Sequence, residues 1–234
     1  MPNPETLPTT LIIGASRGLG LAMAQTYLER GWCVIGTARG AARTPLHDLV
    51  HRAKGRLEIE SLDIAMPDQI AALRARLTGR KLDLLFVNAG VIDQPQKTIG
   101  EVSTEEFIRI MTTNALGPLR VIEALEGFVP PTGTIGVMSS GLGSVGANTQ
   151  GGFETYRASK AALNTLMRSF AARHAGDPRT FLIMDPGWVR TDMGGPNAQL
   201  SVDESIPRLV EVISAQSGKG GLQYLDYGGR TVPW

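Results

Sequence analysis

Short apolar runs alternate with amphipathic helical patterns along the whole chain, and this alternation limits the fold more than any other feature. Strands that alternate with helices indicate β-α-β units around a parallel sheet. We therefore predict one α/β domain over residues 1–234, with a doubly wound (Rossmann) parallel sheet of about seven strands and helices on both faces. Residues 1–8 are expected to form a flexible N-terminal tail. The predicted strands are Leu11–Gly14, Trp32–Ala38, Leu57–Leu62, Leu82–Val87, Thr134–Ser139, Thr180–Met184 and Leu222–Leu225.

Several of the intervening helices are indicated by an apolar face or by a capping pattern at their N-terminus. A helix before Gly55 is predicted from apolar residues at i, i+3, i+4 and i+7, which are Leu46, Leu49, Val50 and Ala53. Ser103 with Glu106, and Ser201 with Glu204, have the spacing of capping boxes at the starts of two later helices. Asn114 falls within the apolar stripe of the first of these.

Charge and composition exclude several classes of function. The 23 Lys and Arg residues nearly balance the 22 Asp and Glu residues, so a net charge of +1 gives no electrostatic reason to expect a nucleic-acid partner. The one cysteine, Cys33, cannot form an intramolecular disulfide and suits a reducing compartment. The sequence has neither a signal-peptide pattern nor an apolar run that could form a membrane helix. We expect a cytoplasmic protein that binds a small molecule.

A glycine-rich turn joins the first predicted strand to the first predicted helix. The segment Gly14-Ala15-Ser16-Arg17-Gly18-Leu19-Gly20 has the spacing G-x-x-x-G-x-G and lacks the lysine of a P-loop. Bare backbone amides at a helix N-terminus can bind a diphosphate. The alternative is a tight connection with no ligand.

The residues after the second strand favour NADP over NAD. In dinucleotide-binding folds an acidic residue at this place binds the ribose of NAD, whereas arginine accommodates the 2′-phosphate of NADP. The sequence has Ala38 and Arg39 there, and Arg17 in the glycine turn can approach the same phosphate. The alternative is that both are ordinary surface arginines.

Tyr156 and Lys160 lie four positions apart at the start of a predicted helix, so they share one face. A cation at ~4 Å in an effective dielectric of ~20 would favour the phenolate by about 4 kcal/mol, or roughly three pKa units. This predicts a tyrosine that can exchange protons near neutral pH. A lone pair at this spacing is also common on protein surfaces.

Together these motifs resemble the short-chain dehydrogenase/reductase family over essentially the whole chain. The resemblance rests on Gly14–Gly20, Asn88-Ala89-Gly90, Ser139-Ser140, Tyr156 with Lys160, and Pro186-Gly187. The segment 141–155 and the ending from Tyr227 to Trp234 look most like the C-factor and sniffer-type carbonyl reductases. The sequence departs from the family at Ile13, where a threonine is usual.

The resemblance implies a role for each matching residue. Tyr156 would be the general acid-base, Lys160 would lower its pKa and hold the nicotinamide ribose, Ser140 would bind the substrate carbonyl, and Asn114 would anchor a relay water. Asp63 would contact adenine. The full implied NADP(H) site is Gly14, Ser16, Arg17, Gly18, Leu19, Gly20, Arg39, Asp63, Ile64, Asn88, Ala89, Gly90, Tyr156, Lys160, Pro186, Gly187, Val189 and Thr191.

Some assignments stay open at the level of sequence. Side-chain alternation cannot choose between Ser139 and Ser140, and only the family alignment prefers Ser140. Asn114 has the competing interpretation of a buried, satisfied amide. The segment His47-Asp48-Leu49-Val50-His51 imitates a zinc motif, but its acid is too short and no third ligand follows, so we expect no metal site.

The sequence therefore predicts an NADP-dependent oxidoreductase that interconverts a ketone or aldehyde and an alcohol. Two alternatives are an NADP-binding sensor or signalling protein with little turnover and, less favoured, a sugar-nucleotide epimerase or dehydratase. Residues 188–200 should form a mobile lid and residues 141–153 the opposite wall, both suited to a modest uncharged carbonyl compound. The resemblance implies a homodimer or homotetramer.

Overall fold

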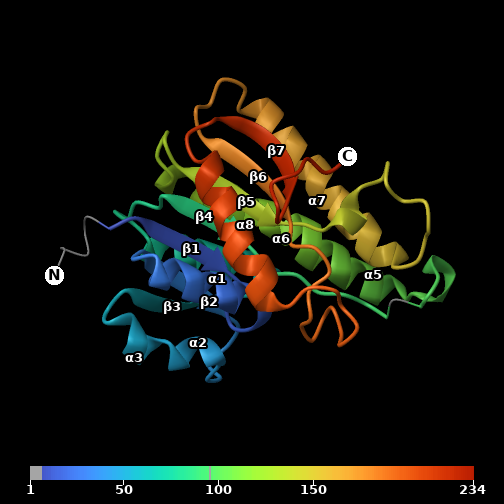
Figure 1. The fold of residues 1–234 in the computed structure, drawn as a ribbon, viewed down its shortest axis with the longest axis horizontal. Coiled ribbons are helices and arrows are strands. Elements are labelled where there is room, and N and C mark those ends of the chain that lie inside the picture. The colour runs from blue at the N-terminus through green and yellow to red at the C-terminus, as the bar shows by residue number, and fades with distance from the viewer. Residues whose placement is uncertain (1–6, 95) are drawn as a thin grey trace.

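A parallel sheet forms the centre of the computed structural model, which describes residues 7–94 and 96–234. Its seven strands follow the order β3-β2-β1-β4-β5-β6-β7, and every neighbouring pair is parallel (Figure 1). This confirms the predicted fold class. The strands are β1 (Thr9–Ile13), β2 (Cys33–Ala38), β3 (Leu57–Ser61), β4 (Leu84–Val87), β5 (Thr134–Met138), β6 (Thr180–Asp185) and β7 (Gly221–Asp226).

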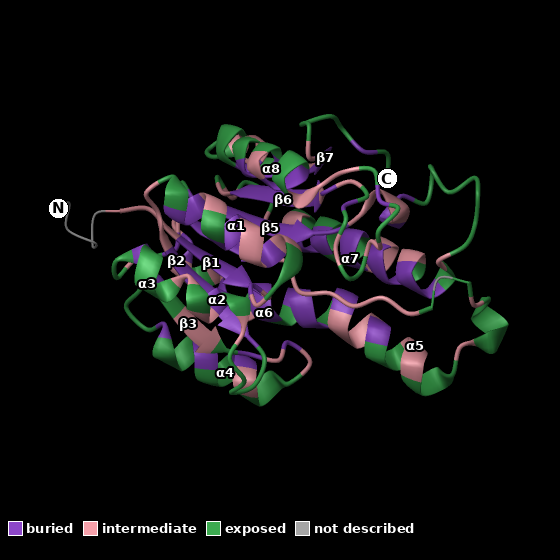
Figure 2. Cartoon of the chain, turned by 60° about the horizontal axis from the view of Figure 1, so that its bottom comes forward, coloured by how far each residue is buried: buried purple, intermediate pink, exposed green. Residues whose placement is uncertain are grey.

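Helices cover both faces of the sheet because the side chains of each buried strand alternate between two apolar cores. Leu11 and Ile13 pack in one core with residues of α4 (Pro67–Arg76), α6 (Gly117–Leu125) and α7 (Glu154–Arg173). Ile12 points the other way, into a core with α1 (Gly18–Glu29) and α8 (Val202–Gln216). Figure 2 shows the strands buried between these two layers. Near-continuous apolar strands are typical of parallel sheets covered on both sides.

The long predicted helix after Ser103 is interrupted in the middle. It consists of α5 (Thr104–Met111), a π-helical turn η3 (Thr112–Leu116) and α6. A π-helical turn inserts one extra residue into the helical ladder and is frequent at functional sites. Short 3₁₀ turns occur at η2 (Ile99–Glu101), η4 (Glu126–Phe128) and η5 (Gly141–Gly143).

Two local predictions are wrong. The helix expected over residues 46–53 is two short helices, α2 (Pro45–Asp48) and α3 (Val50–Ala53), because the Leu49 amide donates to Leu46 O and tightens the chain there. The Ser103 cap is only half of a box: its hydroxyl accepts from the Glu106 amide, but the Glu106 carboxylate pairs with Arg109 instead.

Pro8, the last residue of the expected N-terminal tail, lies beside the sheet. Pro8 O accepts a hydrogen bond from the Cys33 amide, so the segment is already attached to the sheet before β1 begins. Residues 1–6 lie outside the described part of the chain. In that described part, none of the helices has the length and apolarity that crossing a membrane requires.

The strand order brings the loops with the predicted motifs to one edge. β1 lies between β2 and β4, so the loops after β1 and β4 meet where the direction of winding reverses. In doubly wound sheets this switch point, outside the carboxyl ends of the strands, is where ligands bind.

Candidate active site

The glycine turn after β1 is held from both sides by neighbouring strands. The Gly14 amide donates to Thr37 Oγ1 on β2 at 2.8 Å, and Asn88 Nδ2, after β4, donates to Gly14 O at 2.7 Å. A Cβ on Gly20 would lie 2.0 Å from Gly14 O, so only glycine allows α1 to start this close to the strand. Sequence reasoning missed Thr37, since a threonine within a strand carries no motif.

The outer side of the same turn is open. Arg17 and Gly18 are exposed, Gly18 has a φ of +56°, and a Cβ there would meet nothing within 4 Å. The first turn of α1 carries no acidic residue. Exposed amides at the N-terminus of a helix whose first turn carries no acidic residue suit an anionic diphosphate, so the turn fits the predicted dinucleotide.

A cleft at the carboxyl ends of β2 and β3 contains Arg39. Asp63 lies in the same lining and accepts from the Ala65 amide at 2.9 Å. Arg76 pairs with Glu60 at 2.7 Å, whereas Arg39 forms no ion pair or hydrogen bond with any described residue. The Arg39 guanidinium is therefore available to a phosphate. The cleft is lined by Arg39, Gly40, Glu60, Ser61, Asp63, Gln69, Ala72 and Arg76.

Arg17 is placed differently from the expectation. Its guanidinium pairs with Asp192 at 2.5 Å, on the loop after β6, and it does not line the cleft that contains Arg39. Both side chains of this pair are exposed, so their interaction is worth little in free energy. Of the two arginines that the sequence offered to the 2′-phosphate, the structure thus places Arg39, and not Arg17, in the cleft with Asp63.

The other residues of the implied cofactor site lie around the same edge. Gly90 touches the centre of the site, because a Cβ there would lie 3.4 Å from both Asn114 Oδ1 and Lys160 Nζ. Pro186 O accepts from the Ser205 hydroxyl at 2.7 Å, which attaches the loop after β6 to α8. Four of the remaining residues are half-buried in their turns or loops: Ser16, Leu19, Ala89 and Gly187. Ile64 and Val189 are buried. Thr191 Oγ1 accepts from the Gly194 amide.

Tyr156 and Ser140 face each other at the carboxyl ends of β5 and β6. Ser140 follows β5, and its hydroxyl is hydrogen-bonded to the Tyr156 phenol and also accepts from the Leu142 amide at 3.2 Å. Ser139 instead donates to Asn164 Oδ1 at 2.7 Å and is buried. The structure thus brings Ser140, and not Ser139, to the tyrosine.

Lys160 lies behind the tyrosine ring. Its Nζ is 5.7 Å from the centre of the Tyr156 ring and donates to Met138 O at 2.9 Å. Burial of the ammonium lowers the pKa of Lys160 to about 8. The lysine therefore gives up its proton more easily than one in water.

The expectation that Lys160 lowers the pKa of Tyr156 is not met in this structure. Burial raises the pKa of Tyr156 well above its usual range, and the charge of Asp185 and the Tyr224 phenol add to this, while the Ser140 hydrogen bond opposes it. Removing a phenolate from water is the largest of these effects. The spacing in the sequence revealed the pairing of the two residues but not the burial that they share.

Asn114 lies in the π-helical turn and is fully buried. Its Oδ1 accepts from the Val91 amide at 2.8 Å, and its Nδ2 donates to Val91 O at 2.8 Å and to Ser159 Oγ at 2.9 Å. Ser159 in turn donates to Tyr156 O at 2.7 Å, which links Asn114 to the tyrosine helix. The side chain is a satisfied amide, as the alternative interpretation holds. Sequence reasoning missed Ser159 although it lies between Tyr156 and Lys160.

Comparison with known proteins places this chain in a family. Residues 8–200 match the family model described as short chain dehydrogenase. The chain belongs to this family. A solved short-chain dehydrogenase/reductase from Burkholderia multivorans with bound NADP is 58% identical, with a TM-score of 0.96, and the match covers 97% of this chain and all of that one.

Two further relatives agree with the resemblance seen in the sequence. C-signal from Myxococcus xanthus is 37% identical over 158 residues, which are 65% of this chain and 93% of that protein. Carbonyl reductase Sniffer of D. melanogaster is 29% identical with a TM-score of 0.86, covering 97% of this chain and 100% of that one. The likeness to the C-factor and sniffer-type group is confirmed.

The two histidines of the zinc-like segment have other surroundings in this short chain dehydrogenase. His47 Nδ1 accepts from the Thr44 amide at 3.0 Å and so completes the cap of α2, while His51 is exposed on α3. Over residues 7–94 and 96–234, no cluster of three or more His, Cys, Asp or Glu side chains is arranged to hold a metal ion.

Proposed function

We propose that this protein is an NADP(H)-dependent reductase that interconverts a ketone or aldehyde with an alcohol, with Tyr156 as the acid-base group. The observation that carries the proposal is the Ser140 hydroxyl on the Tyr156 phenol, with buried Lys160 behind them, at the sheet edge that also holds the glycine turn. A hydroxyl and a phenol that converge on one point can hold a carbonyl oxygen and give it a proton.

The cofactor assignment rests on the fit of the turn and the cleft. The Gly14–Gly20 turn would hold the diphosphate, Arg39 the 2′-phosphate and Asp63 the adenine side. The NADP-bound relative from Burkholderia multivorans supports this choice. When bound, the nicotinamide supplies or accepts the hydride, which no side chain can do.

The side chains would then handle the proton. Burial favours the neutral phenol of Tyr156, so this group is protonated at neutral pH and can donate in the direction of reduction. Ser140 would orient the carbonyl oxygen toward that phenol. Lys160 and the π-helical turn at Asn114 lie behind the phenol, where a proton could be replaced from water through backbone carbonyls. This arrangement supports a role in which the backbone of Asn114, and not its side chain, anchors the relay water.

The proposed substrate is a small, largely uncharged carbonyl compound. The walls at residues 141–153 and 188–200 expose the apolar side chains Val145, Trp188 and Met193, whereas the charges of Arg17 and Asp192 neutralise each other. An apolar wall with few polar groups selects by shape more than by charge. A homodimer or homotetramer in the cytoplasm remains part of the proposal.

Turnover of a panel of ketones and aldehydes with NADPH tests the function directly. We expect reduction of at least one uncharged member, and Tyr156→Phe should bind NADPH normally while losing at least ~10²-fold in kcat, as expected when a general acid is removed. NADPH binding without turnover of any panel member would instead favour a cofactor-binding sensor. Absence of NADPH binding would refute the cofactor assignment.

A further inference from the structure

Asp185 is a carboxylate beside the candidate site to which none of the motifs assigns a role. It is the last residue of β6 and directly precedes Pro186-Gly187. Its Oδ1 accepts from the Gly187 amide at 3.1 Å, and the carboxylate also accepts from the Gly141 amide. A Cβ on Gly141 would lie 2.9 Å from Asp185 Oδ2, so the turn after Ser140 rests directly on this side chain.

One carboxylate therefore joins the two loops that form the walls of the proposed substrate site. Gly141 opens the 141–153 wall, and Gly187 directly precedes the 188–200 wall. A carboxylate has acceptors only, so it can bind two amides at once. An asparagine of the same shape would turn its NH₂ group toward one of them and leave that amide without an acceptor.

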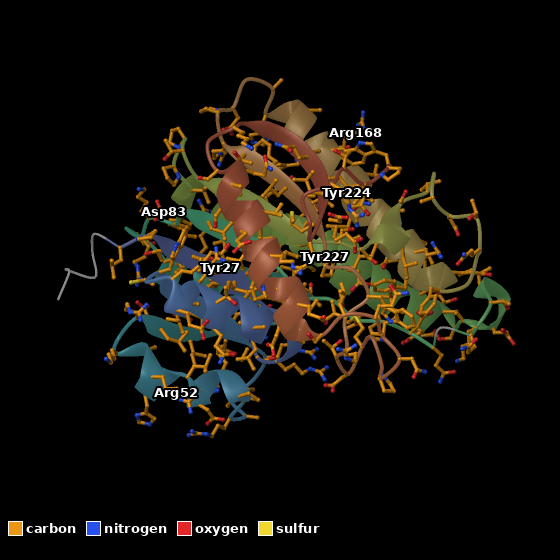
Figure 3. The ribbon with its side chains drawn as sticks, viewed as in Figure 1. Tyr27, Arg52, Asp83, Arg168, Tyr224 and Tyr227 are labelled. Carbon is orange, nitrogen blue, oxygen red and sulfur yellow. The ribbon has the colours of Figure 1, made fainter. Side chains whose placement is uncertain are left out.

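The same turn is also held from β7. The Tyr224 hydroxyl donates to Ser140 O at 2.5 Å; this tyrosine is labelled in Figure 3. Ser140 is thus fixed by its own carbonyl on one side and by the amide of its neighbour Gly141 on the other. The Ser140 hydroxyl is hydrogen-bonded to the Tyr156 phenol. The contacts that hold the Ser140 turn therefore position this hydroxyl against the phenol.

We propose that Asp185 is a positioning residue of the proposed reductase, which holds the turn after Ser140 so that the Ser140 hydroxyl faces Tyr156. This inference rests on the proposed function and adds a residue to it. Asp185 is not placed to exchange a proton with substrate; it acts through Ser140 and Tyr156.

The charges around both groups agree with this role. Tyr156 is faced by Asp185 from β6, Tyr224 from β7, Ser140 from the loop and Lys160 from its own helix. Of these, Asp185 contributes a negative charge that opposes the phenolate. Asp185 is itself faced by Asp226 on β7, which together with burial raises the pKa of Asp185, while the Gly141 and Gly187 amides stabilise its ionised form.

The decisive variant is Asp185→Asn, compared with the wild-type protein in both reaction directions. We expect kcat for reduction to fall about tenfold or more, since small misplacements of reacting groups are costly, with little change in the KM for NADPH. The pH at which alcohol oxidation reaches half its plateau should move to lower pH by about 0.5 unit, since a negative charge near the phenol is lost. Asp185→Glu keeps the charge and should leave this pH unmoved.

Asp226→Asn is the matched control. It removes the carboxylate that is the register partner of Asp185 on the next strand, and that carboxylate accepts from the Gly228 and Arg230 amides and pairs with Arg230. We expect it to lower the melting temperature without moving the pH profile. A shift as large in Asp226→Asn as in Asp185→Asn would overturn the specific role of Asp185.

Amide hydrogen exchange supplies a readout that needs no substrate. The Gly141 amide should exchange at least tenfold faster in Asp185→Asn than in the wild type or Asp226→Asn. Unchanged exchange at Gly141 would overturn the proposal that Asp185 holds this turn. Faster exchange with an unmoved pH profile would mean that Asp185 supports the fold but does not act on Tyr156. A wild-type protein that reduces no carbonyl would refute the proposed function, and exchange at Gly141 would still decide whether Asp185 holds the turn.

Discussion

Lys160 Nζ donates to Met138 O at 2.9 Å and lies 5.7 Å from the centre of the Tyr156 ring. The ammonium is almost completely buried, and its hydrogen bond goes to a neutral carbonyl. Burial of a cation without a paired anion costs free energy, which is reflected in the lowering of the lysine pKa to about 8. This unfavourable burial occurs beside Tyr156, the proposed acid-base group.

The first prediction concerns this lysine and the pH dependence of stability. Its pKa is about 8 when folded and near 10.5 in a free lysine, so between these values the unfolded chain holds a proton that the folded one lacks. The contribution of Lys160 to the free energy of unfolding must therefore rise with pH across this window, by at most about 3 kcal/mol. Below about pH 8 both states carry the proton and the full cost of burial applies.

Urea denaturation of wild type and Lys160→Met at pH 7.5 and pH 10 checks this sign. In Lys160→Met the free energy of unfolding should not gain the contribution that it gains in the wild type between these two pH values. Lys219 is exposed, so Lys219→Met is the control that should behave like the wild type. Parallel pH dependence in the wild type and Lys160→Met would contradict the prediction.

The second prediction separates two neighbouring serines. Ser139 donates to buried Asn164, so Ser139→Ala should destabilise the fold by ~1–3 kcal/mol by leaving an acceptor unsatisfied, while most activity is retained. Ser140→Ala should cost little stability but lower kcat by ~10- to 100-fold, since it removes the hydroxyl that faces Tyr156. Steady-state kinetics and denaturation of both variants test the pair, and reversed effects would contradict the assignment.

The third prediction concerns the cofactor. Arg39→Asp should weaken NADPH binding by ~1–3 kcal/mol and leave NADH binding nearly unchanged, because a charge-assisted bond to the 2′-phosphate is replaced by repulsion. Arg76→Ala is the matched control, since Arg76 lines the same cleft but is already paired with Glu60. Fluorescence titration gives both dissociation constants. Equal losses for the two cofactors would mean that Arg39 does not read the phosphate.

The fourth prediction concerns a tyrosine far from the chemistry. Tyr27 is fully buried in the core between α1 and α8, and its hydroxyl makes no hydrogen bond with any described residue (Figure 3). Tyr27→Phe should therefore stabilise the fold by about 1 kcal/mol, since an unsatisfied polar group leaves the interior. Thermal unfolding measures this gain in stability. An unaltered kcat would show that Tyr27 takes no part in catalysis. A loss of stability would point to an unseen partner of the hydroxyl.

The sequence by itself determined the architecture and the location of the site. Apolar runs that alternate with helical periodicities predicted seven strands and helices on both faces, because burial on two sides of a parallel sheet requires that pattern. The glycine turn and the Tyr156–Lys160 spacing were readable because each depends on local backbone geometry. Residues close in sequence carry such signals in their spacing.

Only the tertiary structure decided how the site residues meet. The choice of Ser140 over Ser139, the diversion of Arg17 to Asp192, and the tether from Asp185 to Gly141 all join segments distant in sequence. Desolvation likewise depends on everything that packs around a group, so the raised pKa of Tyr156 could not be read from its lysine alone. Local spacing fixes which residues share an element, whereas packing between elements fixes their partners and their charge states.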